Sequence, residues 1–192
     1  MFKVALLVFF MNLSLGWGMV ADGIHSIDAY QDLAHESPAF DAACAVEDHA
    51  SSISQTGVLI EPDIIATAAH GVLHMLQNRS LEANSKPVKV TEVYATFINQ
   101  GIRSSYPIEY VIVDARYTEN SGLQPKYDIA FVKLKTPLWH IKPAEIFTEK
   151  EIPAQALMTV VSFGMADLIG QPNLKRAFRL YECDNYQPLA YD

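Results

Sequence analysis

Short apolar runs separated by turn residues fill most of this chain from residue 43 onward, and they constrain its fold more than any other feature. Residues 55–60 and 64–67 are strand-like, and Glu61-Pro62-Asp63 between them is a strong turn signal. Because these runs are short and no long amphipathic helix competes with them, the pattern favours an all-β domain over alternating βαβ units. Further strands are predicted at 88–97, 108–113, 130–134, 158–163 and 176–181, with a loop at 164–173.

Composition predicts a folded domain without a nucleic-acid partner. The chain has 192 residues, of which 50% are hydrophobic, enough for one complete small domain plus part of another. The 14 basic and 22 acidic residues give a net charge of −8 and are scattered along the sequence. Since no stripe of Lys and Arg is present, the sequence offers no phosphate-binding surface.

The amino terminus has the layout of a secretory signal peptide, which we place at residues 1–21. Met1-Phe-Lys3 precedes an apolar run over 4–15, and small residues follow. This run is shorter than the roughly 20 apolar residues of a membrane-spanning helix. We therefore predict a secreted or periplasmic protein without a membrane span after cleavage near residue 19 or 22. Residues 22–41 are expected to form a leader segment, with a short helical turn at 28–34.

Two motifs 58 residues apart carry the chemistry. Ala66-Thr-Ala-Ala-His70 and Tyr127-Asp-Ile-Ala-Phe-Val-Lys-Leu134 resemble the His-bearing and Asp-bearing segments of the trypsin/chymotrypsin-like serine peptidases. Residues 24–34, followed by Pro38-Ala-Phe40, resemble the start of exported bacterial members of that family. The resemblance implies peptide-bond hydrolysis, with His70 as general base and acid and Asp128 as the carboxylate that orients it. The corresponding separation in the family is roughly 45 residues. The longer spacing here implies loop insertions around 73–86 and 118–125.

The resemblance also implies an all-β fold of two antiparallel β-barrels, the first complete over 42–140. Residues 141–192 would form a linker and a partial second barrel, because no Gly-Asp-Ser-Gly segment occurs and the family spacing puts the nucleophile near residue 220. Ser121 and Ser162 are poor substitutes, since the oxyanion hole uses backbone around the nucleophile itself. We therefore predict a chain, apparently truncated, that is inactive alone. A non-catalytic secreted protein-binding module and a decaying gene product stay open as alternatives.

Other candidate sites are weaker. His70 and His74 have the spacing of a helical metal-binding pair, but no third ligand is evident, so no metal is expected. Cys44 and Cys183 could form a disulfide in an exported chain, although their number alone does not imply it. Asn78-Arg-Ser80 fits the glycosylation pattern. No cofactor is required, the expected partner is a protein or peptide substrate, and the sequence leaves specificity, activation and oligomeric state open.

Overall fold

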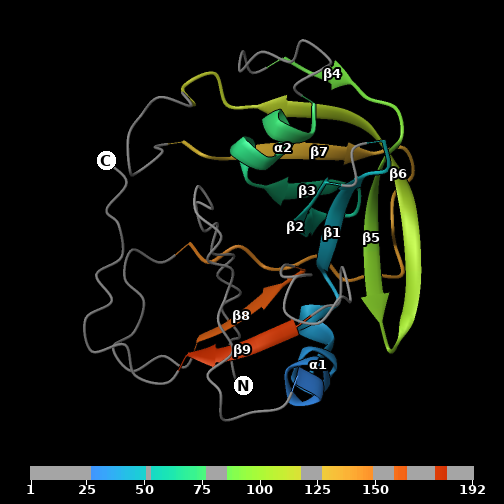
Figure 1. The fold of residues 1–192 in the computed structure, drawn as a ribbon, viewed down its shortest axis with the longest axis vertical. Coiled ribbons are helices and arrows are strands. Elements are labelled where there is room, and N and C mark those ends of the chain that lie inside the picture. The colour runs from blue at the N-terminus through green and yellow to red at the C-terminus, as the bar shows by residue number, and fades with distance from the viewer. Residues whose placement is uncertain are drawn as a thin grey trace.

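The computed structural model describes residues 27–50, 53–76, 86–117, 127–148, 158–163 and 176–180. They form an all-β fold built on a closed antiparallel barrel, which confirms the expected fold class, and a smaller sheet lies next to this barrel (Figure 1). Among these residues, no helix is long and apolar enough to cross a membrane. The segment 1–21, expected to be a signal peptide, lies outside the described residues.

Six of the described strands close the barrel. Their order around the ring is β1, β2, β3, β7, β6 and β5, and β5 pairs back to β1, with every pairing antiparallel. A short seventh strand, β4 (Val88–Lys89), joins the edge of β6. The ring strands are β1 (Ala43–Asp48), β2 (Ile53–Glu61), β3 (Ile64–Thr67), β5 (Val93–Asn99), β6 (Ile102–Val113) and β7 (Ala130–Leu134).

The barrel interior holds the main hydrophobic core. Successive side chains of a strand point to opposite faces, so in β1 Cys44 and Val46 join the interior cluster while alternate residues face outward. The interior is narrow at Gly57 of β2, where a Cβ atom would lie 2.7 Å from Ile65 Cγ2. The interior cluster also contains Leu59, Ile65, Val93, Ala95, Phe97, Ile108, Val111, Val113, Ala130, Val132 and Leu134.

Two backbone turns place strand boundaries where the sequence pattern did not. The single strand predicted over 88–97 is wrong, because β4 and β5 are separated around Glu92, whose φ of 60° is uncommon for a non-glycine residue. β5 and β6 are joined through Gln100 and Gly101, with φ values of 52° and 77°. Positive φ at both central residues is typical of the type I′ hairpin turn. β6 therefore begins at Ile102, well before the residue 108 that the sequence suggested.

β1 is a strand that the sequence analysis did not specify. Its sequence, Ala43-Cys-Ala-Val-Glu-Asp48, has three small residues and two acids and so shows little β-strand preference. All six residues are nevertheless buried, because the barrel core covers one face and a second cluster covers part of the other. Tertiary burial on both faces makes this segment a strand.

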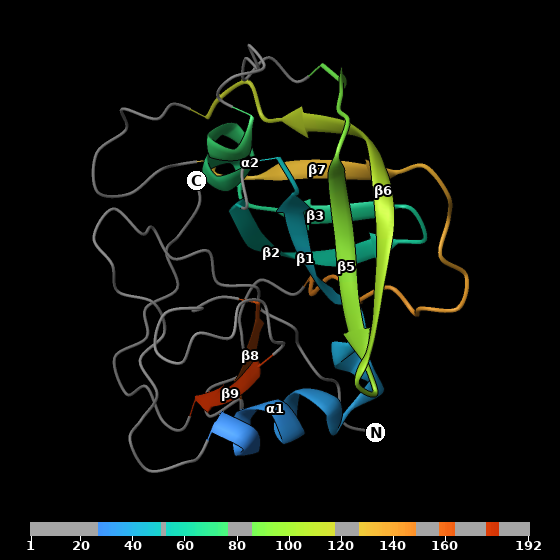
Figure 2. The ribbon, with the colours of Figure 1, turned by 45° about the vertical axis from the view of Figure 1, so that its right-hand side comes forward.

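The second cluster joins the barrel to the remaining described elements. The helix α1 (Ile27–His35) matches the predicted helical turn, and the 3-10 helix η1 (Pro38–Phe40) follows it. β8 (Met158–Ser162) and β9 (Arg176–Leu180) form an antiparallel pair close to both predicted strands. Figure 2 shows this pair and α1 together below the barrel. The cluster comprises Ala34, Phe40, Ala43, Ala45, Ile98, Val161 and Phe163.

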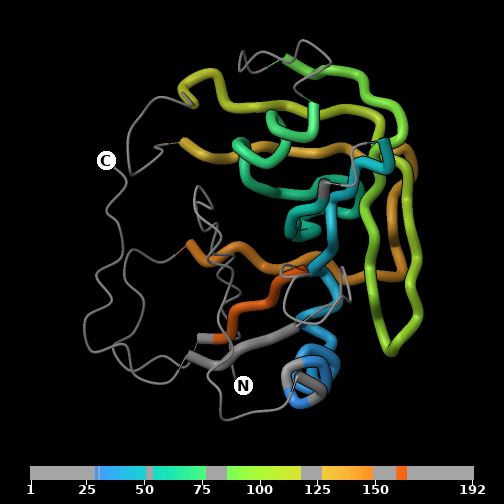
Figure 3. The backbone as a smooth tube through the Cα atoms, viewed as in Figure 1, coloured from blue at the N-terminus to red at the C-terminus, as the bar shows by residue number. Residues whose placement is uncertain are grey.

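The segment that follows β7 is held along the β2–β3 hairpin. Leu138 N donates to Pro62 O at 2.7 Å, and Ala144 N donates to Leu59 O at 2.8 Å. In Figure 3 this orange part of the tube descends beside the barrel and then crosses beneath it toward β8. A further hydrogen bond, from Phe163 N to Thr56 Oγ1 at 2.9 Å, attaches the end of β8 directly to β2.

Candidate active site

The pairing of β3 with β7 brings the two sequence motifs together. Thr67, the last residue of β3, lies opposite Ala130, the first residue of β7. Since the strands are antiparallel, the residues that follow β3 and those that precede β7 emerge at the same end of the barrel. His70 comes three positions after Thr67, and Asp128 comes two positions before Ala130. The strand register therefore brings the side chains of His70 and Asp128 together, as expected.

Both carboxylate oxygens of Asp128 contact His70. Oδ2 lies 2.6 Å from Nδ1 of the ring, and Oδ1 accepts a hydrogen bond of 2.8 Å from the backbone N–H of the same residue. The Asp128 side chain is 11% exposed and that of His70 is 31% exposed. The two-point contact fixes the position of the carboxylate relative to the backbone as well as to the ring.

Asp128 also accepts a hydrogen bond from a backbone N–H in the first turn of a helix. His70 is the second residue of α2 (Ala69–Met75), where backbone N–H groups have no partner within the helix. Ala68 occupies the N-cap position without a side-chain hydrogen bond. The carboxylate therefore takes the place of a capping side chain, in a position where the helix dipole favours negative charge. Capping and orientation of the ring follow from one interaction.

The contact assigns different roles to the two ring nitrogens. A neutral imidazole that donates Nδ1–H to Asp128 carries its lone pair on Nε2. No described side chain forms a hydrogen bond with Nε2, and the ring is partly exposed. The ring can thus accept a proton at Nε2 from an external donor, while the carboxylate stabilises the resulting positive charge at Nδ1.

Gln55 supports this site and was not recognised from the sequence. Its Nε2 donates to Ala68 O at 3.3 Å, directly before α2, and the amide lies against Gly71, the residue after His70. A Cβ atom at position 71 would lie 1.6 Å from Gln55 Oε1, so the amide occupies the space that any larger residue would need. Gln55 Oε1 is itself buried without a hydrogen-bond partner among the described residues. Gly71, a glycine inside a helix, is the sequence signal that could have indicated this close approach.

The remaining sequence candidates do not join the site. Ser162 lies in β8 opposite Arg176, and no hydrogen bond links it to His70 among the described atoms. His74 is exposed in the last turn of α2, and the described part of the chain contains no group of three or more His, Cys, Asp or Glu residues that could hold a metal ion. Cys44 is buried in the barrel. Ser121, Cys183 and the Asn78-Arg-Ser80 triplet lie outside the described residues.

Comparison with models of known families gives a match over most of the chain. The family model described as trypsin matches residues 34–181, a span that contains the whole barrel, His70, Asp128 and the β8–β9 pair. A search of curated proteins found no match.

Proposed function

Because this chain belongs to the trypsin family, we propose that it is an exported relative of the serine endopeptidases in which His70 is the general base and acid and Asp128 orients it. The observation that carries this proposal is the two-point contact of the Asp128 carboxylate with the ring and backbone of His70. The substrate class is a protein or peptide, and the chemistry needs no cofactor.

The proposed reaction proceeds through an acyl-enzyme. As a serine hydroxyl oxygen attacks the substrate carbonyl carbon, Nε2 of His70 takes the hydroxyl proton, and Asp128 stabilises the imidazolium through Nδ1–H. The imidazolium then returns the proton to the amine nitrogen as the C–N bond breaks. Water repeats the sequence on the acyl ester, with its proton again passing to Nε2. Each of these steps uses the tautomer that the contact with Asp128 favours.

We propose that none of the serines in these 192 residues is the nucleophile of this reaction. They contain no Gly-Asp-Ser-Gly segment, and Ser162 belongs to the β8–β9 sheet rather than to a loop near His70. We therefore propose that the chain alone does not hydrolyse peptides. In a serine peptidase that uses the same triad mechanism on another fold, loss of the nucleophile costs on the order of a millionfold in turnover.

A fluorophosphonate probe, which reacts with activated serines, tests this proposal. We expect no labelling of the 192-residue chain, and we expect labelling of a longer product if its gene encodes a Gly-Asp-Ser-Gly-like segment downstream. That labelling should disappear in His70→Ala and persist in His74→Ala, a matched control because His74 is exposed on the same helix. Labelling of the 192-residue chain that Ser121→Ala or Ser162→Ala abolishes would overturn the assignment of an external nucleophile.

The rival function, a secreted protein-binding module without catalysis, gives a different result. A longer product that binds a protein target equally well with and without His70→Ala, and that never reacts with the probe, would replace the peptidase proposal with this one. Export is tested separately, by sequencing the amino terminus of the recovered protein. Under the proposal the mature chain begins near residue 19 or 22, and recovery of Met1 on a soluble cytoplasmic protein would contradict export.

A further inference from the structure

Asp128 is presented by an unusual backbone turn. Tyr127, directly before it, has φ of 61°, a left-handed conformation that is uncommon for a residue with a large side chain. Ile129 N donates to Tyr127 O at 2.7 Å, which closes a three-residue turn with Asp128 at its centre. The direction of the Asp128 side chain therefore depends on a conformation that the Tyr127 backbone does not favour by itself.

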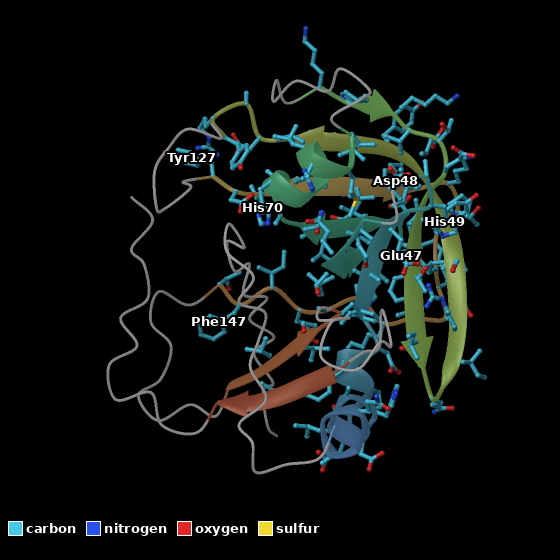
Figure 4. All side chains as sticks on the ribbon, in the orientation of Figure 1. Glu47, Asp48, His49, His70, Tyr127 and Phe147 are labelled. Carbon is cyan, nitrogen blue, oxygen red and sulfur yellow. The ribbon has the colours of Figure 1, made fainter. Side chains whose placement is uncertain are left out.

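The Tyr127 ring is covered by a cation. The guanidinium carbon of Arg116 lies 4.1 Å from the centre of the ring, within the range of a cation–π interaction. Figure 4 shows Tyr127 at the same end of the barrel as His70. This contact restrains the side chain of a residue whose backbone adopts the left-handed conformation directly before Asp128.

Arg116 is in turn anchored to the barrel by Asp114. Its Nε and Nη2 atoms donate to the two carboxylate oxygens of Asp114 at 3.0 and 2.7 Å, and its backbone N donates to Oδ1 at 2.8 Å. Asp114 directly follows β6, and its backbone N donates to Ile129 O at 3.3 Å. Hydrogen bonds from Arg116 hold the pKa of Asp114 at about 2, well below its usual 3.8, because they stabilise the charged form of the carboxyl.

We propose that Arg116 is a positioning residue: anchored by Asp114 and stacked on Tyr127, it holds the turn that aims Asp128 at His70. The inference rests on the proposed function, since it explains how the orienting carboxylate is itself oriented. A role in stability alone explains the arrangement less well. The Arg116 side chain is 65% exposed, and exposed ion pairs contribute little to folding free energy.

Hydrogen exchange at His70 tests the proposal without requiring catalysis. The backbone N–H of His70 is at the start of α2 and, among the described residues, is bonded only to Asp128, so its exchange rate reports how well the carboxylate is placed. The exchange rate of the ring Nδ1 proton reports the second contact. The amide of Leu76, the C-cap residue of the same helix, donates to Val72 O at 3.1 Å and to Leu73 O at 3.2 Å and is an internal reference. All rates are measured by NMR on the full 192-residue chain.

Two variants remove, in different ways, the contact between Arg116 and the Tyr127 ring, which we call the clamp. Arg116→Gln removes the cation from an exposed position, and Tyr127→Asn removes the ring while keeping a residue that tolerates positive φ. In Arg116→Gln we expect the two His70 protons to exchange about two- to fivefold faster, the factor that corresponds to an exposed cation–π contact. In Tyr127→Asn the acceleration should be smaller, because Asn adopts positive φ more readily than Tyr. Leu76 should exchange as in the unmodified chain. If Tyr127→Asn fails to fold, Arg116→Gln alone decides.

Matched controls separate positioning from general stability. Tyr127→Phe keeps the ring and should exchange at the original rates. Arg103→Gln breaks another partly exposed pair, with Glu47, which Figure 4 shows well away from His70. It should leave the exchange of His70 unchanged even if the melting temperature falls. Equal effects of Arg103→Gln and Arg116→Gln on the His70 protons would overturn the proposal.

The remaining outcomes distinguish this inference from the function on which it rests. Slow exchange at His70 in the unmodified chain, with no change in folded Arg116→Gln, would reject the clamp and leave the pairing of His70 with Asp128 intact. Fast exchange of both protons already in the unmodified chain would reject the pairing, and with it both the clamp and the proposed function.

Discussion

Gly71→Ala is a small substitution for which two opposing free energies can be compared. Glycine in a helix interior is less favourable than alanine by about 0.8–1.0 kcal/mol, so helix preference alone predicts stabilisation. The structure predicts the reverse, because the new Cβ would lie 1.6 Å from Gln55 Oε1 and 2.5 Å from Gln55 Cδ. The amide of Gln55 must move, since no pair of heavy atoms tolerates such a contact.

The cost of that movement exceeds the gain in helix preference. Moving the amide breaks the hydrogen bond from Gln55 Nε2 to Ala68 O, worth about 1 kcal/mol. Forcing the half-buried Gln55 side chain into another conformation adds about 1–2 kcal/mol. Subtracting the helix gain leaves a net loss of about 1–2 kcal/mol in the free energy of unfolding. For a domain of this size, each kcal/mol corresponds to a shift of about 2–4 °C in melting temperature.

A double-mutant cycle measured by urea unfolding isolates the contact. In a Gln55→Ala background the space is open, so Gly71→Ala should stabilise the protein by up to about 1 kcal/mol. The sign of the Gly71→Ala effect should therefore invert between the two backgrounds, with a coupling energy of about 2–3 kcal/mol. Equal stabilisation by Gly71→Ala in both backgrounds would refute the reasoning, because it would mean that the Gln55 amide does not occupy this space.

Three further variants test other parts of the fold. Phe97→Ala, in the barrel core, should lower the free energy of unfolding by about 3–5 kcal/mol in urea titrations, and a loss below 1 kcal/mol would contradict its packing. Glu47 is buried and accepts hydrogen bonds from Thr96 Oγ1 at 2.6 Å and twice from Arg103 Nη2 at 2.9 Å. Glu47→Ala should therefore cost about 1–3 kcal/mol in thermal or urea unfolding, and no loss would mean that this network is not formed. Because the folded-state pKa of Asp114 is depressed to about 2, its contribution is fully present above 3.8 and is lost as the pH falls through about 2. The difference in free energy of unfolding between the original chain and Asp114→Asn should shrink as the pH falls through that window. A difference that grows toward low pH would contradict a lowered pKa of Asp114.

Local sequence was sufficient for the strands whose side chains alternate and for the two chemical motifs. The hairpin 55–67 has apolar runs around Pro62, and the structure places its strands at Ile53–Glu61 and Ile64–Thr67. His70 and Asp128 could be identified because each sits in a run of characteristic neighbours. The segments β7, β8 and β9 also follow their predicted ranges closely. In each case the information lies within about ten consecutive residues.

The tertiary structure decided what depends on pairing between distant segments. β1 is a strand because both of its faces are covered, although its own residues show little strand preference. Gln55 meets Gly71 only because β2 lies beneath the start of α2, and Arg116 reaches Tyr127 only because the β6–β7 register places their flanking turns together. Such contacts depend on strand register, and register is selected by burial of the whole barrel interior rather than by any short segment. The sequence could therefore identify the two residues that we propose as base and orienting acid, while the residues that hold them in place became visible only in the closed barrel.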